Sequence, residues 1–160
     1  MKEIKRVMAC VDLSDYSMMT VEYTLAIVRG LKTEVLLFNV INSRDIEYLK
    51  SASPHFPEGF NVEKYLERVK AERHRAIQEM IEKHFLKDKA QMNVLIQVGV
   101  PFDAILKAII TEHVDLVVIA SKGQSNLIGT LFGSNAEKVF RHSPVPVLSV
   151  RSRERFGRKR

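Results

Sequence analysis

The sequence predicts a doubly wound α/β fold, Rossmann-like, with a five-stranded parallel sheet and helices on both faces. Five short apolar segments alternate along the chain with segments of helical periodicity. The apolar segments are hydrophobic almost throughout, as strands are when a parallel sheet is covered on both sides. The length of 160 residues, 46% of them hydrophobic, suits one domain with a core of its own.

The order of the expected elements is β-α-β-α-β-α-β-α-β. Strands are expected at residues 4–11, 34–41, 92–98, 115–120 and 145–150. Helices are expected at about 17–29, at 62–84 after a cap at Asn61, at 102–110 and from about 134. The inward faces of the last two helices are expected to include Ile110 and Phe140. Residues 42–60 contain two prolines and a glycine without a sustained period, so a long loop is expected there.

The net charge of +6 comes mainly from the end of the chain, where residues 151–160 carry six arginines and lysines against Glu154. We therefore expect one domain over 1–150 and a basic, disordered tail over 151–160. Nucleic-acid binding is not expected of the nearly neutral body, and only weak contact through the tail stays open. No apolar run has the length of a membrane span and no signal-peptide layout is present, so a cytoplasmic protein is expected. The single cysteine, Cys10, is expected to be a small buried hydrophobe.

The stretch ASKGQSNLIGTLFGSNAEK follows the fourth expected strand and leads into a helix. Ligands of doubly wound sheets bind beyond the carboxyl ends of the strands, so this stretch is a candidate site. The helix that begins near Ser134 would offer free N–H groups to an anion, and Gly133 would allow a turn and a close approach. Lys122 could add charge. Neither a P-loop motif nor a dinucleotide fingerprint is present.

The motifs, taken together, resemble the universal stress protein family. Its ATP-binding members carry G-x2-G-x9-G-[ST] after the fourth strand, and here Gly123 and Gly133-Ser134 stand at that spacing. The segments VMACVDLSDYS, FNVI, GVP and NAEKVFRHSPVPVLSV resemble other parts of the family in the same order. The resemblance covers nearly the whole chain, least so residues 42–60. It implies an adenine nucleotide alpha-hydrolase-like fold.

The resemblance also implies a binding site for ATP, or for ADP or AMP, with Mg²⁺. Asp12, next to Val11, would bind the ribose or orient the base end, and the backbone of Val40 would meet the adenine edge. Gly99 and Pro101 would shape the adenine side. The phosphates would be held by residues of the stretch that follows the fourth strand: Ser121, Gly123, Gly133, Ser134 and Asn135. The departure is Ala120, where the motif has its first glycine. Its methyl could crowd the ligand, and it would strain the chain if φ were positive.

Simpler interpretations stay open for two of these sites. Asp12 could cap the first helix, in competition with Ser14. Gly99-Val100-Pro101 could be a plain turn from strand to helix, with the proline in the first helical turn.

Three functions follow from the resemblance. The first is a nucleotide-binding regulatory protein of the stress response, which acts through an unknown protein partner or as a homodimer through the strand near 146–150. The second is a nucleotide-free dimerisation or adaptor module, supported by Ala120. The third is a slow ATPase or autophosphorylating protein, for which no catalytic residue is identified.

Overall fold

The computed structural model describes residues 3–52, 60–122 and 133–151 and shows the predicted five-stranded parallel sheet. Its strands are β1 (Arg6–Cys10), β2 (Glu34–Asn42), β3 (Met92–Gly99), β4 (Leu116–Ala120) and β5 (Val147–Val150). They lie in the order β3-β2-β1-β4-β5, and every pairing is parallel. The chain winds away from β1 in both directions, so the carboxyl end of β1 is the place where a doubly wound sheet binds ligands.

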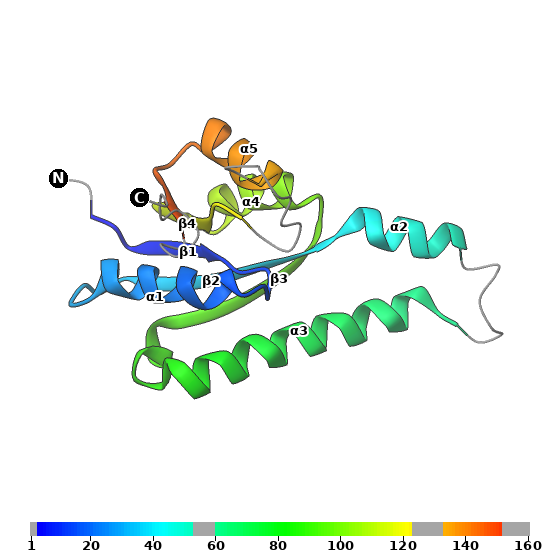
Figure 1. Cartoon of the computed structure of the whole chain (residues 1–160), viewed down its shortest axis with the longest axis horizontal. Helices are drawn as coiled ribbons and strands as arrows, with labels where there is room; N and C mark the ends of the chain where they lie inside the picture. Colours follow the sequence, from blue (N-terminus) through cyan, green and yellow to red (C-terminus); the bar gives the residue numbers. More distant parts are fainter. Residues whose placement is uncertain (1–2, 53–59, 123–132, 152–160) are drawn as a thin grey trace, which may run out of the picture.

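Helices cover both faces of the sheet (Figure 1). On one face lie α1 (Tyr16–Val28) and α3 (Val62–His84), and on the other lie α4 (Pro101–Thr111) and α5 (Ser134–His142). A short 3-10 helix, η2 (Leu86–Gln91), joins α3 to β3. Successive residues of a strand point to opposite faces, so Val7 and Ala9 pack toward α1 and α3 while Met8 packs toward α4 and α5.

The predicted start of α3 is confirmed. The side chain of Asn61 accepts a hydrogen bond from the backbone N–H of Lys64 at 2.8 Å, which satisfies a donor that the first helical turn leaves free. In the described part of the chain, no helix is both long and apolar enough to cross a membrane.

The prediction of a loop over the whole of 42–60 is wrong, because residues 43–52 form helix α2 (Ser43–Ala52). This helix buries a single residue, Ile46, which packs with Ile41 and Val62. The half-buried Leu49, three residues later, packs in the same cluster, so the apolar face of α2 consists of two residues. So short a pattern did not stand out beside the two prolines and the glycine that follow it in the sequence. α2 continues from the carboxyl end of β2, beyond the ends of the strands, and lies beside the first turns of α3 (Figure 1).

Two side chains that were expected to face the core are exposed. Ile110 of α4 is 62% exposed and Phe140 of α5 is 61% exposed. Each follows a buried residue, Ile109 and Val139, and one step along a helix turns the side chain by about 100°, away from the sheet. The buried faces of these helices are therefore narrower than the runs of apolar residues indicated.

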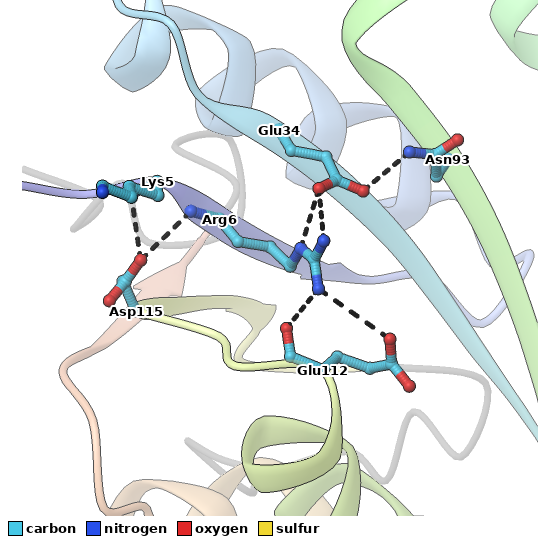
Figure 2. Close-up of polar contacts among 6 residues, drawn as sticks. All are labelled: Lys5, Arg6, Glu34, Asn93, Glu112 and Asp115. Carbon is cyan, nitrogen blue, oxygen red and sulfur yellow. Dashed lines mark hydrogen bonds and ion pairs between the residues drawn. The ribbon is translucent and has the colours of Figure 1, made fainter.

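At the amino ends of the strands, Arg6 joins three elements (Figure 2). Its Nε and Nη2 donate to one carboxylate oxygen of Glu34 at 2.8 and 2.6 Å, and Nη1 donates to the carbonyl of Glu112. Asn93 donates to the other Glu34 oxygen at 2.7 Å. Burial opposes ionisation of Glu34, but the hydrogen bonds from Arg6 and Asn93 and the charge of Arg6 outweigh it, so its pKa lies below the ordinary value.

The backbone N–H groups of Lys5 and Arg6 also donate to Asp115, at 2.9 and 3.1 Å, so this end of the sheet is held by polar contacts (Figure 2). These contacts lie at the amino ends of the strands. The opposite end of the sheet is left for a ligand.

Candidate functional site

A cavity of about 300 Å³ opens at the carboxyl ends of β1, β2 and β4, and the first turns of α4 and α5 form part of its wall. This volume is in the range of small-molecule sites. The sequence-predicted site residues that line it are Val11, Asp12, Val40, Pro101, Ala120, Ser121, Gly133, Ser134 and Asn135. Gly99 does not line the cavity, and Gly123 lies outside the described residues.

Asp12 follows β1 and sits in a tight polar turn. Its Oδ1 accepts hydrogen bonds from the Ser14 N–H at 3.0 Å, the Ser14 hydroxyl at 2.5 Å and the Ser17 hydroxyl at 3.2 Å. The residue between, Leu13, has φ of +62°, a conformation that leucine rarely adopts. Asp12 thus orders the turn into α1, while the first residue outside that helix is Asp15, whose side chain makes no capping bond.

The end of β4 and the start of α5 meet in space although ten residues separate Lys122 from Gly133. The N–H of Gly133 donates to the carbonyl of Ser121 at 2.7 Å, and the N–H of Ser121 donates to Val150 of β5 at 2.9 Å. The N–H of Gly133 is therefore used within the protein. The N–H groups of Ser134 and Asn135, in the first turn of α5, have no acceptor within the helix and line the cavity wall.

Gly133 has φ of −70° and ψ of 146°, which any residue can adopt. A Cβ added there would contact the Ser121 carbonyl at 3.6 Å and the Lys122 Cα at 4.0 Å, both ordinary distances. The expected turn at Gly133 is therefore made with ordinary backbone angles and does not use the conformational freedom of glycine. Gly133 lines the cavity beside the first turn of α5, so a side chain added there could affect a ligand that approaches the helix.

Ala120 ends β4 and pairs with Val150 in a regular parallel register. Positive φ values occur, among described residues other than glycine, at Leu13 and His113 alone, so Ala120 carries no such strain. Alanine is thus compatible with the backbone at this position. Ala120 lines the cavity, so any effect of this residue on a ligand would come from its methyl group.

The two residues predicted on the α4 side have different roles. Gly99 pairs with Asn42 at the end of β3, and a Cβ on it would meet the Cβ of Ala104 at 3.4 Å. This is a close but ordinary contact, so Gly99 lies beside α4 and its backbone and surroundings do not require a glycine. Pro101 occupies the first turn of α4, as the simpler interpretation expected, and also lines the cavity.

A buried polar network closes the β2 side of the cavity, and sequence reasoning did not assign it to the site. Asn39, 1% exposed, donates from Nδ2 to the Val11 carbonyl at 2.7 Å. Nη1 of Arg73, on α3, donates to Asn39 Oδ1 and to the Val40 carbonyl, both at 3.0 Å. The signal available in the sequence was an arginine at a position of the apolar stripe of α3. Asn42 and Asp45 also line this side and were likewise not predicted.

The charged residues that line the cavity are Asp12, Asp45, Arg73 and Lys122. Cys10 lines it too, but burial, and secondarily the charge of Asp12, raises the pKa of its thiol to about 12. The thiol is therefore protonated at neutral pH and is a poor nucleophile. Among the described residues, no cluster of three or more His, Cys, Asp or Glu side chains could hold a metal ion.

The fold agrees with the comparison to known proteins. The model of the Universal stress protein family matches residues 3–151. The chain belongs to the universal stress protein family. It is 31% identical over 157 residues to the universal stress protein MJ0577 of Methanocaldococcus jannaschii, an alignment that covers 92% of this chain and 94% of that protein. A universal stress protein of Thermus aquaticus is 43% identical over 60 residues, which cover 37% of this chain and 43% of that protein.

Solved structures of universal stress proteins share the fold. The structure of MJ0577 superposes with a TM-score of 0.77 at 24% identity, covering 94% of this chain and 97% of that one. A universal stress protein in complex with cAMP has a TM-score of 0.63 at 20% identity, covering 94% and 98%. A family member from Arabidopsis thaliana with AMP bound has a TM-score of 0.60 at 18% identity, covering 97% of both chains.

Proposed function

We propose that this universal stress protein binds an adenine nucleotide, ATP or else ADP or AMP, and acts as a regulatory protein through partner or dimer contacts. The observation that carries the proposal is the cavity at the carboxyl ends of β1, β2 and β4, which meets the amino end of α5. That helix end attracts anions through its free N–H groups and its dipole. Neither the backbone angles of Gly133 nor the space around it requires a glycine at this position, and the absence of a side chain keeps the end of α5 accessible.

The residues of the cavity fit the parts of a nucleotide. The N–H groups of Ser134 and Asn135 and the Ser134 hydroxyl would bind phosphates. Ser121, Gly123 and the charge of Lys122, which follow β4, would contribute from the other end of the loop. The Asp12 carboxylate would accept from ribose hydroxyls, next to the backbone of Val11. The base would lie toward Val40 and Pro101. Two universal stress proteins of the same fold, one in complex with cAMP and one with AMP bound, support this class of ligand.

Mg²⁺ is proposed to accompany ATP. Magnesium is usually held by substrate phosphates, water and one or two carboxylates, and not by a cage of protein ligands. Of the carboxylates in the cavity wall, Asp12 is assigned to the ribose and Asp45 lies on the β2 side, so the phosphates and water would supply most of the ligands of the ion. The ion would offset the negative charge of the phosphates beside α5.

We also propose a homodimer through β5. This strand is at the edge of the sheet, paired on one side with β4. Leu148 within it is 37% exposed and Phe140 of the neighbouring α5 is 61% exposed. An edge strand with apolar neighbours can pair with its copy across a two-fold axis. Ligand binding in the cavity could alter the dimer contact at β5, because the backbone N–H of Ser121, which lines the cavity, donates a hydrogen bond to the carbonyl of Val150.

Isothermal titration with AMP, ADP and ATP, each with and without Mg²⁺, tests the binding proposal. CTP with Mg²⁺ is the control for a non-purine triphosphate. We expect saturable binding of at least one adenine nucleotide and weaker binding of CTP. If no adenine nucleotide binds, the adaptor alternative replaces this proposal. Phosphate release in the same samples would measure turnover, and steady release would favour the ATPase alternative.

A further inference from the structure

Arg73 places a cation in the wall of the cavity at the end of β2. It comes from α3, in the stripe of that helix that faces the sheet, where its neighbours along the stripe are Val69 and Ile77. The guanidinium is half-buried, and Nη1 donates to Asn39 Oδ1 and to the Val40 carbonyl oxygen at 3.0 Å each. Asn39 is itself fixed by its bond to the Val11 carbonyl. Arg73 is therefore held in place and does not extend into solvent.

The Val40 carbonyl is a backbone acceptor that β1 does not use. The pairing of β1 with β2 ends at Cys10 and Phe38, and the N–H of Val11 donates to the Phe38 carbonyl as the last contact. Val40 comes two residues later, so its carbonyl is directed to the same side of β2 as that of Phe38, past the end of β1. This is the place where Arg73 reaches it.

The cavity runs across the end of β1. The amino end of α5 lies on the β4 side, while Val40 and Arg73 lie on the β2 side. A nucleotide whose phosphates bind at α5 therefore brings its base toward Val40 and Arg73. This step rests on the proposed function.

We propose that Arg73 is a specificity-determining residue that competes with the ligand for the Val40 carbonyl oxygen and lowers the preference for purines with an amino group at position 6. A 6-amino group is a hydrogen-bond donor and needs an acceptor at this edge. The guanidinium has five N–H donors and no acceptor. It takes one of the two lone pairs of the Val40 carbonyl oxygen, and its positive charge and remaining N–H groups oppose the approach of a second donor to the other. A 6-oxo group is an acceptor and can take a hydrogen bond from the guanidinium.

The test compares ATP with inosine triphosphate, which carries an oxygen at position 6 in place of the amino group. Dissociation constants for both are measured with Mg²⁺ on the full chain, on Arg73→Met and on Arg75→Met. Arg75 lies on the same helix, is exposed and does not line the cavity, so it controls for the loss of one positive charge. We expect Arg73→Met to shift the ratio of the two constants toward ATP by roughly 5- to 10-fold, and Arg75→Met to leave it unchanged.

Using a ratio within one variant removes effects that weaken both ligands alike, such as a loss of order around Asn39. An unchanged ratio in Arg73→Met, with nucleotide still bound, would overturn the role of Arg73 and leave the proposed function standing. Failure of the full chain to bind either nucleotide would overturn the proposed function itself. If Arg73→Met does not fold, Arg73→Lys has fewer donors and is expected to shift the ratio in the same direction by less. No shift in that variant would also refute the proposal.

Discussion

Substitutions at Gly133 separate a role in ligand binding from a role in folding. Three variants are informative: Gly133→Asp, Gly133→Asn and Gly133→Ala. The position precedes α5, has ordinary backbone angles and has room for a Cβ at 3.6 Å from its nearest contact. Asp and Asn are favoured at the start of a helix, by a few tenths of a kcal/mol relative to Gly. Removing a glycine also reduces the entropy of the unfolded chain, by about 0.4–1 kcal/mol.

Gly133→Asp and Gly133→Asn are therefore expected to unfold at the same denaturant concentration as the parent or slightly higher. Alanine is a poorer residue than glycine at the start of a helix, which offsets the gain from the unfolded chain, so Gly133→Ala is expected to unfold at a similar or slightly lower concentration. Their effects on binding should differ. A carboxylate about 5 Å from a phosphate charge, at an effective dielectric constant of about 20, costs roughly 3 kcal/mol, which corresponds to more than 100-fold in affinity. Gly133→Asn has nearly the same shape without the charge, so it should lose only what the added bulk costs.

The assay is titration of each variant with ATP and Mg²⁺, beside urea unfolding in the absence of nucleotide. We expect Gly133→Asp to keep its stability and lose binding, with Gly133→Asn and Gly133→Ala between it and the parent. If Gly133→Asp binds ATP as tightly as the parent, phosphate does not bind at α5 and the reasoning from the helix end is refuted.

Three other predictions concern separate parts of the molecule. Ala120→Gly removes a methyl group from the cavity wall and should tighten ATP binding by about 2- to 10-fold. It should also lower the free energy of unfolding by about 0.5–1 kcal/mol. An unchanged affinity in the titration would mean that the methyl group points away from the ligand. Glu34→Gln should lower the free energy of unfolding at pH 7 by about 1 kcal/mol, allowing for solvent screening. The folded-state pKa of Glu34 is lowered, so this contribution is complete above the unfolded pKa and is lost as pH falls through the folded one; a difference in urea unfolding that persisted at pH 2 would contradict it. Leu148→Lys should convert the proposed dimer to monomer in sedimentation experiments, whereas Tyr48→Lys, at a 72% exposed position on α2, should leave the assembly unchanged.

The sequence predicted the sheet because each strand is apolar on both faces, a pattern that depends little on distant contacts. It missed α2 because the apolar face of that helix consists of Ile46 and the half-buried Leu49 alone, next to a segment with two prolines and a glycine. It misplaced Ile110 and Phe140 because a run of adjacent apolar residues does not show which of them lies at the edge of the buried face. Such details depend on where the helix rests on the sheet.

The candidate site was predicted where strand ends could be recognised, as at Asp12 and Ala120, and where a motif marked the loop, as at Gly133. Arg73 could not be placed there from the sequence, because its contact with Val40 joins residues 33 positions apart through the packing of α3 on β2. Gly99 shows the opposite error. This residue is close in sequence to the cavity-lining Pro101 and was expected to line the cavity, but it ends β3 beside Ala104 of α4 and does not line it.

The central claim is that the cavity holds an adenine nucleotide. The most direct test is to purify the protein without added nucleotide, denature a concentrated sample, and identify the released small molecules by chromatography and mass spectrometry. The account predicts an adenine nucleotide in near-stoichiometric amount, or an empty protein that is stabilised against heat by ATP and Mg²⁺. A protein that releases no nucleotide and shows no thermal shift with any adenine nucleotide would contradict it.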